Sequence, residues 1–195
     1  DSMDEIKVLF DFAKIGEWNK IKEYLHKNKD IDLNIKDQND NYLLQHALVQ
    51  NKPKIVELLL EYGVQLDIVD QDRRSILYLP IKYDNILMIK ILLKANKNNI
   101  GVSILDIKDK YGHIPLHYAI MFKNIIMIDL LLNEGSNVDE PDDEGNNALH
   151  LAIYSRDINI CEKILQAKPL IDDQCNTGET ALHLGCNFQL VDIVK

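Results

Sequence analysis

The stretch DKYGHIPLHYAIMFKNIIMIDLLLNEGSNVDE, Asp109–Glu140, begins with a turn and a short helix. Gly112 lies in the turn and is free to adopt the positive φ that such turns need. Pro115 suits a first helical position, where its missing N–H is not required. Three apolar residues then follow at helical spacing and share one face, namely Leu116, Ala119 and Ile120.

A second helix is predicted at about residues 124–133, and Gly135 ends it. Its apolar stripe is carried by Ile125, Ile128, Leu131 and Leu132. Helices of two to three turns cannot bury such stripes alone. The stretch therefore predicts a unit that is stable only when neighbouring copies stack against it, as in a solenoid.

The rest of the chain repeats this plan at an interval of 33 residues. Three residue types recur at that spacing: Gly112, Gly145 and Gly178; Leu116, Leu149 and Leu182; His117, His150 and His183. The helix cores read IPLHYAI, NALHLAI and TALHLGC. Such self-similarity indicates a tandem array over the chain.

With this period and a T-P-L-H-x-A core, the chain resembles the ankyrin-repeat family over essentially its whole length. The closest matches to the core are Ile114–Ala119 and Thr180–His183. The resemblance implies an all-α repeat solenoid. In it, L-shaped units of two antiparallel helices are joined by β-hairpin fingers and stack into a curved array.

We expect one array over residues 1–195. Its approximate repeats are 4–36, 37–69, 70–108, 109–141, 142–174 and 175–195. The first looks like a polar N-terminal cap, with Val8, Leu9, Phe12 and Ala13 facing inward and Trp18 at the helix corner. The last ends within its second helix, predicted around residues 191–195, so we expect the natural polypeptide to continue.

Repeat 3 departs most from the pattern. Arg73 stands where glycine is usual, and Pro80 lies inside the first helix, where it removes a backbone hydrogen bond. We expect a kinked or shortened helix there. About six extra residues in Asn96–Ser103 are predicted to lengthen the finger or loop before repeat 4.

Charge and cysteine usage exclude several classes of protein. The net charge of −9 argues against binding nucleic acid or an anionic membrane. No signal peptide and no run of about 18 apolar residues is present. The three cysteines form no C-x-x-C pair, which suits an intracellular, cytoplasmic location. Cys161 and Cys186 fall on apolar helix positions and are expected to be buried.

The chemistry-bearing residues do not form a recognisable catalytic or metal site. Equivalent atoms of stacked repeats lie about 8–10 Å apart, whereas zinc needs its ligands at about 2 Å. Each repeated histidine should instead bond the backbone, helped by Thr180 and Asn147, whereas Ile114 cannot help. No hydrolase, metalloprotease or phosphate-binding motif appears. We therefore expect no enzyme activity, cofactor, metal or small-molecule substrate.

By resemblance to the family, partners should contact the finger tips and the outer positions of the first helices. Tyr83, Phe122, Tyr154 and Phe188 are predicted to form an exposed row there. The alternative is that they pack on the neighbouring finger and only stiffen the stack. The full set of candidate partner-binding residues is Arg74, Tyr83, Tyr111, His113, Met121, Phe122, Asp143, Glu144, Tyr154 and Phe188.

The finger charges predict a polarity along this surface. Basic residues dominate the first half, with Lys36, Arg74, Lys108 and Lys110, and acidic residues dominate repeats 5 and 6. A solvated finger surface is the plainer interpretation. If the surface binds, basic residues of the partner should lie over repeats 5 and 6, where they would orient it.

The sequence thus predicts a non-catalytic module that binds a partner protein or peptide. An alternative is the recognition or targeting region of a larger enzyme or effector, with its catalytic part outside these residues. Nucleic-acid binding would rest on the basic fingers alone and is opposed by the net charge of −9. The partner, the source organism and the oligomeric state do not follow from the sequence.

Overall fold

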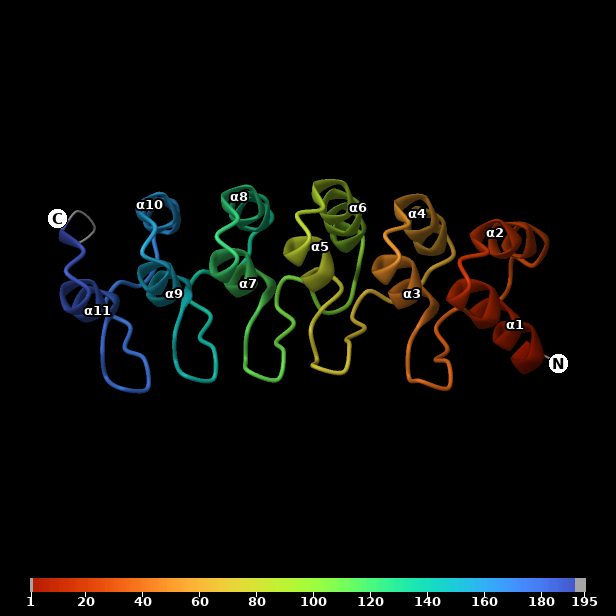
Figure 1. Cartoon of the computed structure of the whole chain (residues 1–195), viewed down its shortest axis with the longest axis horizontal. Helices are drawn as coiled ribbons and strands as arrows, with labels where there is room; N and C mark the ends of the chain where they lie inside the picture. Colours follow the sequence, from red (N-terminus) through yellow and green to blue (C-terminus); the bar gives the residue numbers. More distant parts are fainter. Residues whose placement is uncertain (1, 192–195) are drawn as a thin grey trace.

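The computed structural model describes residues 2–191 and places eleven helices within them, arranged in two rows (Figure 1). The first row holds α1 (Ser2–Lys14), α3 (Leu43–Val49), α5 (Tyr78–Lys82), α7 (Pro115–Met121), α9 (Ala148–Ser155) and α11 (Ala181–Asn187). The second holds α2 (Trp18–Lys27), α4 (Pro53–Glu61), α6 (Ile86–Lys97), α8 (Ile125–Asn133) and α10 (Ile158–Gln166). Successive helix pairs stack along the molecule.

Loops project from one side of the first row in Figure 1 and form the fingers. We number them by repeat and define them by their turns: finger 2 (37–41), finger 3 (70–74), finger 4 (109–113), finger 5 (142–146) and finger 6 (175–179). The arms of fingers 2, 3 and 6 form isolated antiparallel bridges, such as Lys36 with Tyr42 and Gln174 with Thr180, in place of long strands. The predicted all-α repeat solenoid is confirmed.

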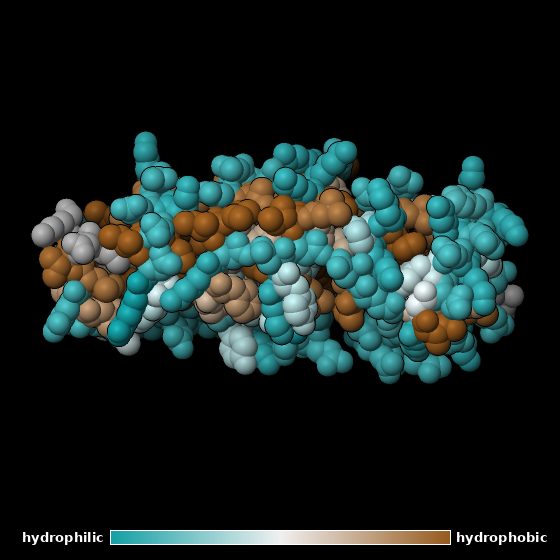
Figure 2. Space-filling model, turned by 45° about the horizontal axis from the view of Figure 1, so that its top comes forward, coloured by the Kyte–Doolittle hydropathy of each residue, from teal (hydrophilic) through white to brown (hydrophobic). Residues whose placement is uncertain are grey.

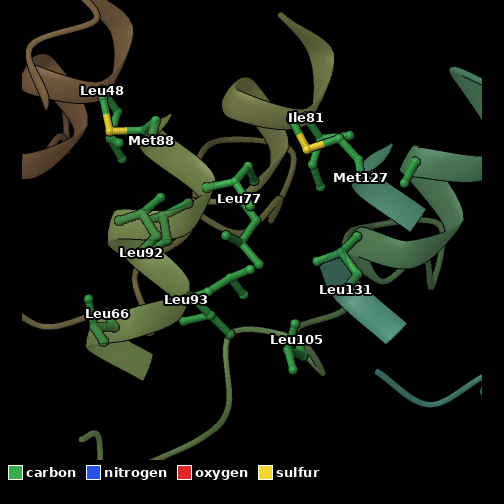
Figure 3. Close-up of a cluster of buried hydrophobic side chains, with 14 of the residues drawn as sticks. Leu48, Leu66, Leu77, Ile81, Met88, Leu92, Leu93, Leu105, Met127 and Leu131 are labelled. Atoms are coloured by element: carbon green, nitrogen blue, oxygen red, sulfur yellow. The ribbon is translucent and has the colours of Figure 1, made fainter. Parts of the chain in front are cut away.

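A single apolar core runs through the stack from Ile6 to Leu184. Figure 3 shows how neighbouring repeats share it: Leu77 and Leu92 of repeat 3 lie between Leu48 of repeat 2 and Leu131 of repeat 4. All four residues are buried. Burial of apolar surface stabilises by about 25 cal/mol per Å², so stacking is what makes each short helix pair stable.

An aspartate closes each of fingers 2 to 5. In finger 4 the Asp109 side chain accepts backbone N–H bonds from Tyr111 and His113, both at 2.8 Å, and its own N–H donates to the His113 carbonyl at 3.0 Å. The same arrangement recurs at Asp37, Asp70 and Asp142. In finger 6 Cys175 takes this position: its N–H donates to the Glu179 carbonyl at 3.0 Å, and its Sγ lies 3.0 Å from the Thr177 hydroxyl.

Fingers 3 to 6 are joined directly by backbone hydrogen bonds. The N–H groups of Lys110, Asp143 and Asn176 donate to the preceding finger, at Asp72, Tyr111 and Glu144, over 3.0, 3.0 and 2.8 Å. The contact is close enough to require glycine. A Cβ on Gly112, whose φ is +76°, would lie 2.7 Å from the Asp143 backbone nitrogen.

Repeat 3 is irregular, as predicted. The α5 helix has only five residues and contains the buried Pro80, and Arg73 adopts a positive φ of 61° in place of glycine. The insertion Asn96–Ser103 was predicted to lengthen the finger or loop before repeat 4, and this is only partly right. The insertion also extends α6 to 12 residues, against 9 in α8, and its other residues form a loop at 98–103.

In repeat 1 the helix face was assigned incorrectly at one position. Val8 is 44% exposed, and the buried residues are Ile6, Leu9, Phe10 and Ala13. These lie at i, i+3, i+4 and i+7 and so form a single stripe. Trp18 is buried at the helix corner, as predicted, and its indole N–H donates to the Gln50 side chain at 2.9 Å.

At the other end, Cys186 is exposed and the prediction of burial is wrong, whereas Cys161 and Cys175 are buried. The inward face of α11 consists of Ala181, Leu184 and Gly185, which leaves Cys186 on its outer side. The predicted second helix of repeat 6 lies, beyond Val191, outside the described residues. Among residues 2–191 no helix is long and apolar enough to cross a membrane.

The finger contacts lead to a prediction for two glycines with similar backbone angles. Gly112→Ala should destabilise the chain by clearly more than Gly178→Ala, although φ is +76° and +82°. In both variants the alanine is strained by its left-handed conformation, which costs about 1–2 kcal/mol. Of the two positions, however, only Gly112 faces a neighbouring backbone within 4 Å. Urea unfolding of both variants measures the difference, and equal losses would contradict the close-contact explanation.

Candidate partner-binding surface

The outer ends of the first helices carry the predicted aromatic residues. Tyr83, Phe122 and Phe188 are the C-cap residues of α5, α7 and α11, and Tyr154 lies in the last turn of α9. Tyr83 is 70% exposed, Phe122 42% and Tyr154 43%, whereas Phe188 is half-buried. Met121, at 40%, lies beside Phe122.

These side chains form separate groups and not one continuous row. The Tyr154 and Phe188 rings meet edge to face at 5.8 Å, and the Arg156 guanidinium lies 4.7 Å from the Phe188 ring. Phe122 belongs to a different cluster, and Tyr83 has only Lys82 close to its ring, at 5.5 Å, among the described cations and aromatics. The gap arises because repeat 5 places Ser155 where repeats 4 and 6 carry phenylalanine.

The cluster around Phe122 includes two tyrosines that the sequence analysis missed. Phe122 stacks on Tyr118 at 5.9 Å and lies 6.2 Å from Tyr78, while the two tyrosines meet edge to face at 4.7 Å. The Arg74 guanidinium covers the Tyr78 ring at 3.9 Å. The sequence offered one sign of this cluster. Tyr78 occupies the place of the repeated histidine, 39 residues before His117, which is the 33-residue period plus the six inserted residues.

Tyr118 is fixed by the aspartate that closes finger 4. Its hydroxyl donates to the Asp109 carboxylate. Burial raises the pKa of Tyr118 strongly, and the bond to Asp109 raises it further. Tyr118 therefore remains a neutral donor and holds the ring beneath Phe122.

His113, a predicted binding residue, lies instead between two buried carboxylates. Its ring nitrogens are 3.6 Å from Asp109 Oδ2 and 3.4 Å from Asp142 Oδ2. It therefore links finger 4 to finger 5. Tyr111, 56% exposed and with the Lys110 ammonium 5.0 Å from its ring, remains accessible at the finger tip.

The predicted basic character of the first half is wrong. Lys36 pairs with Asp40 at 2.9 Å and Lys108 with Glu140 at 2.6 Å. Arg74 and Lys110 both reach the Asp72 carboxylate, at 3.4 and 2.7 Å, and Arg74 also pairs with Asp70 at 2.7 Å. The turns that carry the cations also carry aspartates, and several of these are required to close the fingers.

Fingers 5 and 6 retain exposed negative charge. Within residues 2–191, Asp143, Glu144 and Glu179 have no lysine or arginine at ion-pair distance. The Glu144 carboxylate accepts from the Asn146 amide, and the Glu179 carboxylate accepts from the Thr177 hydroxyl and the Asn187 amide, all of them neutral groups. Asp143 and Glu144 project into solvent, unlike Asp142, which is buried in the finger turn.

The repeated histidines bond the backbone, as predicted. His117 Nδ1 accepts the Ile114 N–H at 3.3 Å, and Nε2 lies 3.1 Å from the Glu140 carbonyl in the next finger segment. His150 makes the equivalent bonds to Asn147 and Glu179, at 3.3 and 3.2 Å. Each imidazole thus connects one repeat to the next.

A glutamine does the same in repeat 2. Gln45 accepts the Tyr42 N–H at 2.8 Å and donates to the Val69 carbonyl at 3.0 Å. This geometry is available to any side chain with one acceptor and one donor at the right separation. The role is structural, and it uses both ring nitrogens of His117 and His150.

The junction between repeats 2 and 3 is open on this surface. Among the described residues no backbone hydrogen bond joins finger 2 to finger 3. A hollow of about 210 Å³ lies there, bordered by Leu48, Leu79 and Arg74. A second hollow of about 740 Å³, bordered by Val49, Pro80 and Tyr83, lies toward the helix turns. The short α5 leaves this space unfilled.

The second helices also expose apolar side chains. Leu87, Ile126 and Ile158 are 59%, 50% and 40% exposed near the starts of α6, α8 and α10. Figure 2, turned so that this row comes forward, shows a brown band along it. All three side chains lie in the first turn of their helices, on the side that faces solvent.

Comparison with known proteins gives consistent results. A family model described as ankyrin repeats, three copies, matches residues 9–104 and 100–174. An ankyrin repeat protein of Acanthamoeba polyphaga mimivirus is 34% identical over 189 residues, which cover 96% of this chain and 25% of that protein. An ankyrin repeat protein of Rickettsia felis is 30% identical over 133 residues, which cover 67% of this chain and 42% of that protein. The chain spans less than half the length of either relative.

Among solved structures, the ankyrin repeat domain of Bcl-3, a member of the IkappaB family, is similar at a TM-score of 0.81. The match covers 95% of this chain and 82% of that one at 20% sequence identity. This likeness concerns the fold alone.

The buried position of His117 predicts a specific pH dependence of stability. Burial lowers the pKa of His117 from 6.5 to about 4, so the folded state favours the neutral ring. The free energy of unfolding is therefore unaffected by His117 above about pH 6.5. It decreases as the pH falls toward 4, by about 2 kcal/mol between pH 7 and 4.5, because the unfolded chain binds a proton at this histidine and the folded chain does not.

His117→Gln should preserve both hydrogen bonds, as Gln45 does, and reduce the acid loss of stability by that amount. Urea unfolding at both pH values measures it. His183→Gln, which changes an exposed histidine, is the control for removing an imidazole. If both variants lose as much free energy of unfolding between pH 7 and 4.5 as the wild type, burial of His117 does not cause that loss.

Proposed function

The chain belongs to the ankyrin-repeat family, and from this we propose that it is a non-catalytic intracellular module that binds a partner protein or peptide. Ankyrin repeats are generally protein–protein interaction modules. We place the binding surface on the fingers and the outer ends of the first helices. The observation that carries the proposal is the pair Phe122 and Tyr154, both exposed and both fixed by aromatic neighbours.

The rigidity of these two residues supports binding. Phe122 rests on Tyr118, which Asp109 holds, and Tyr154 rests against Phe188. Side chains that are already ordered lose less conformational entropy when a partner covers them. Aromatic residues are also enriched among the few that dominate binding energy in interfaces.

The unpaired carboxylates of fingers 5 and 6 support a second element of the proposal. Asp143 and Glu144 would attract lysine or arginine side chains of the partner over repeats 5 and 6. Charges at the rim of an interface mainly raise the association rate and fix the orientation. The aromatic residues would then supply most of the affinity.

The recognition region of a larger enzyme or effector remains a second candidate. The observation that favours it is the length of the mimivirus relative, of which this chain covers 25%. The two candidates share the same binding surface. Assaying the complete natural protein for catalysis, beside the residues described here, separates them.

A double substitution tests the aromatic pair. Phe122→Ala with Tyr154→Ala should weaken binding at least about tenfold, which is roughly 1.4 kcal/mol, while the chain remains folded. The partner is captured on the immobilised wild-type chain and identified, and its Kd for each variant is then measured by calorimetry.

Leu87→Ala, which removes an exposed apolar side chain from α6, is the matched control and should retain full affinity. Thermal unfolding must accompany the binding measurement. If the double variant unfolds, the two aromatic side chains belong to the core and the proposal fails.

The acidic fingers are tested by kinetics. Asp143→Asn with Glu144→Gln should slow association and flatten its dependence on salt, with little change in dissociation, because screening acts on steering charges. Stopped-flow measurements between low and physiological ionic strength report both rates. An unchanged or faster association would rule out steering by these carboxylates.

A further inference from the structure

We propose that the insertion of repeat 3 builds a second docking groove, between the C-terminal ends of α4 and α6, for an apolar and basic segment of a partner protein. This groove is separate from the finger surface and does not depend on the function proposed for it. It is lined by residues of α4, α6 and the segments that follow each helix, and its volume is about 760 Å³.

The insertion forms one wall of the groove. It extends α6 to Lys97, whose ammonium pairs with Glu134 of repeat 4 at 2.9 Å. This pair holds the end of α6 on the side of α8, and the side toward α4 remains open. Asn96 clamps the loop that follows, donating to Ser103 at 3.2 Å and accepting the Ile104 N–H at 3.0 Å.

Regular stacking of the repeats does not require the longer α6 and the loop that follows it. The second helices of repeats 2, 4 and 5 each have nine residues. Of repeats 2 to 5, repeat 3 is the one that extends its helix and adds a loop, and that loop exposes apolar side chains. Ile100 is fully exposed and Val102 is 58% exposed, and they flank Gly101, which lines the groove. An ordered insertion that leaves isoleucine in water does not stabilise the core, which indicates a binding role.

The floor of the groove is apolar. Leu66 and Val64 are buried, and Leu60, Ile91 and Ala95 are half-buried at its surface. A volume of about 760 Å³ exceeds that of one side chain and lies within the range of about 300–1,000 Å³ typical of small-molecule pockets. The groove can therefore receive several apolar side chains from one short segment.

The rim selects the charge of the occupant. Three carboxylates border the groove, Glu57, Glu61 and Asp67, against one ammonium, Lys94. Lys54 approaches Glu57 at 3.3 Å, and Glu61 and Asp67 have no such partner among the described residues. A segment with lysine or arginine beside its apolar residues is complementary to this rim. A second copy of this chain is not, since its net charge is −9.

Two synthetic peptides of about 14 residues, roughly four helical turns, serve as probes. One is a fluorescein-labelled leucine–lysine amphipathic peptide, and the other carries glutamate in place of each lysine. Fluorescence anisotropy should detect binding of the lysine peptide alone. Glu61→Lys with Asp67→Lys should weaken it at least about tenfold, and Ile100→Ser at least about threefold. These residues are exposed, so urea unfolding should not change.

The matched control is Asp143→Lys with Glu144→Lys, which makes the same change of charge on finger 5 and should alter the Kd of the lysine peptide less than about twofold. The proposal is overturned if this control weakens binding as much as the groove variant. It is also overturned if the glutamate peptide binds equally well, or if neither peptide binds. A dimer in sedimentation that Ile100→Ser abolishes would make a second copy the occupant.

Discussion

Burial of apolar side chains between neighbouring repeats is the interaction on which this whole molecule depends. A pair of helices of seven and nine residues, such as α7 and α8, has too few internal contacts to offset the entropy of ordering it. Stacked between α5 and α9, the same pair places Leu116, Ile128 and Leu131 out of contact with water. The core is therefore continuous, and stability is shared among neighbours.

Polar contacts fix the register that this apolar core leaves loose. An aspartate shapes each of fingers 2 to 5 through bonds to backbone N–H groups, and His117 and His150 connect each first helix to the finger segment that follows. Both devices satisfy backbone groups that would otherwise be costly to bury. Because the fingers are held so firmly, the side chains that they and the helix ends project toward solvent have defined positions.

The surfaces with potential for binding lie where these rules are broken or satisfied only in part. Pro80 shortens α5 and opens the junction with repeat 2, while Tyr78 replaces the linking histidine and instead supports Phe122 through Tyr118. The insertion of the same repeat opens a groove on the other side of the stack. Repeat 3 thus borders hollows on both sides of the stack.

The sequence by itself determined the solenoid, the positions of the helices, the positive φ at Gly112 and the short α5, because each depends on local spacing and backbone chemistry. Only the tertiary structure decided which charges remain free and which aromatic residues meet. The cations of the first fingers lie beside aspartates that no periodicity pairs with them, and Tyr118 reaches Asp109 across its own repeat. Such contacts join side chains through space, where sequence patterns carry no information about distance.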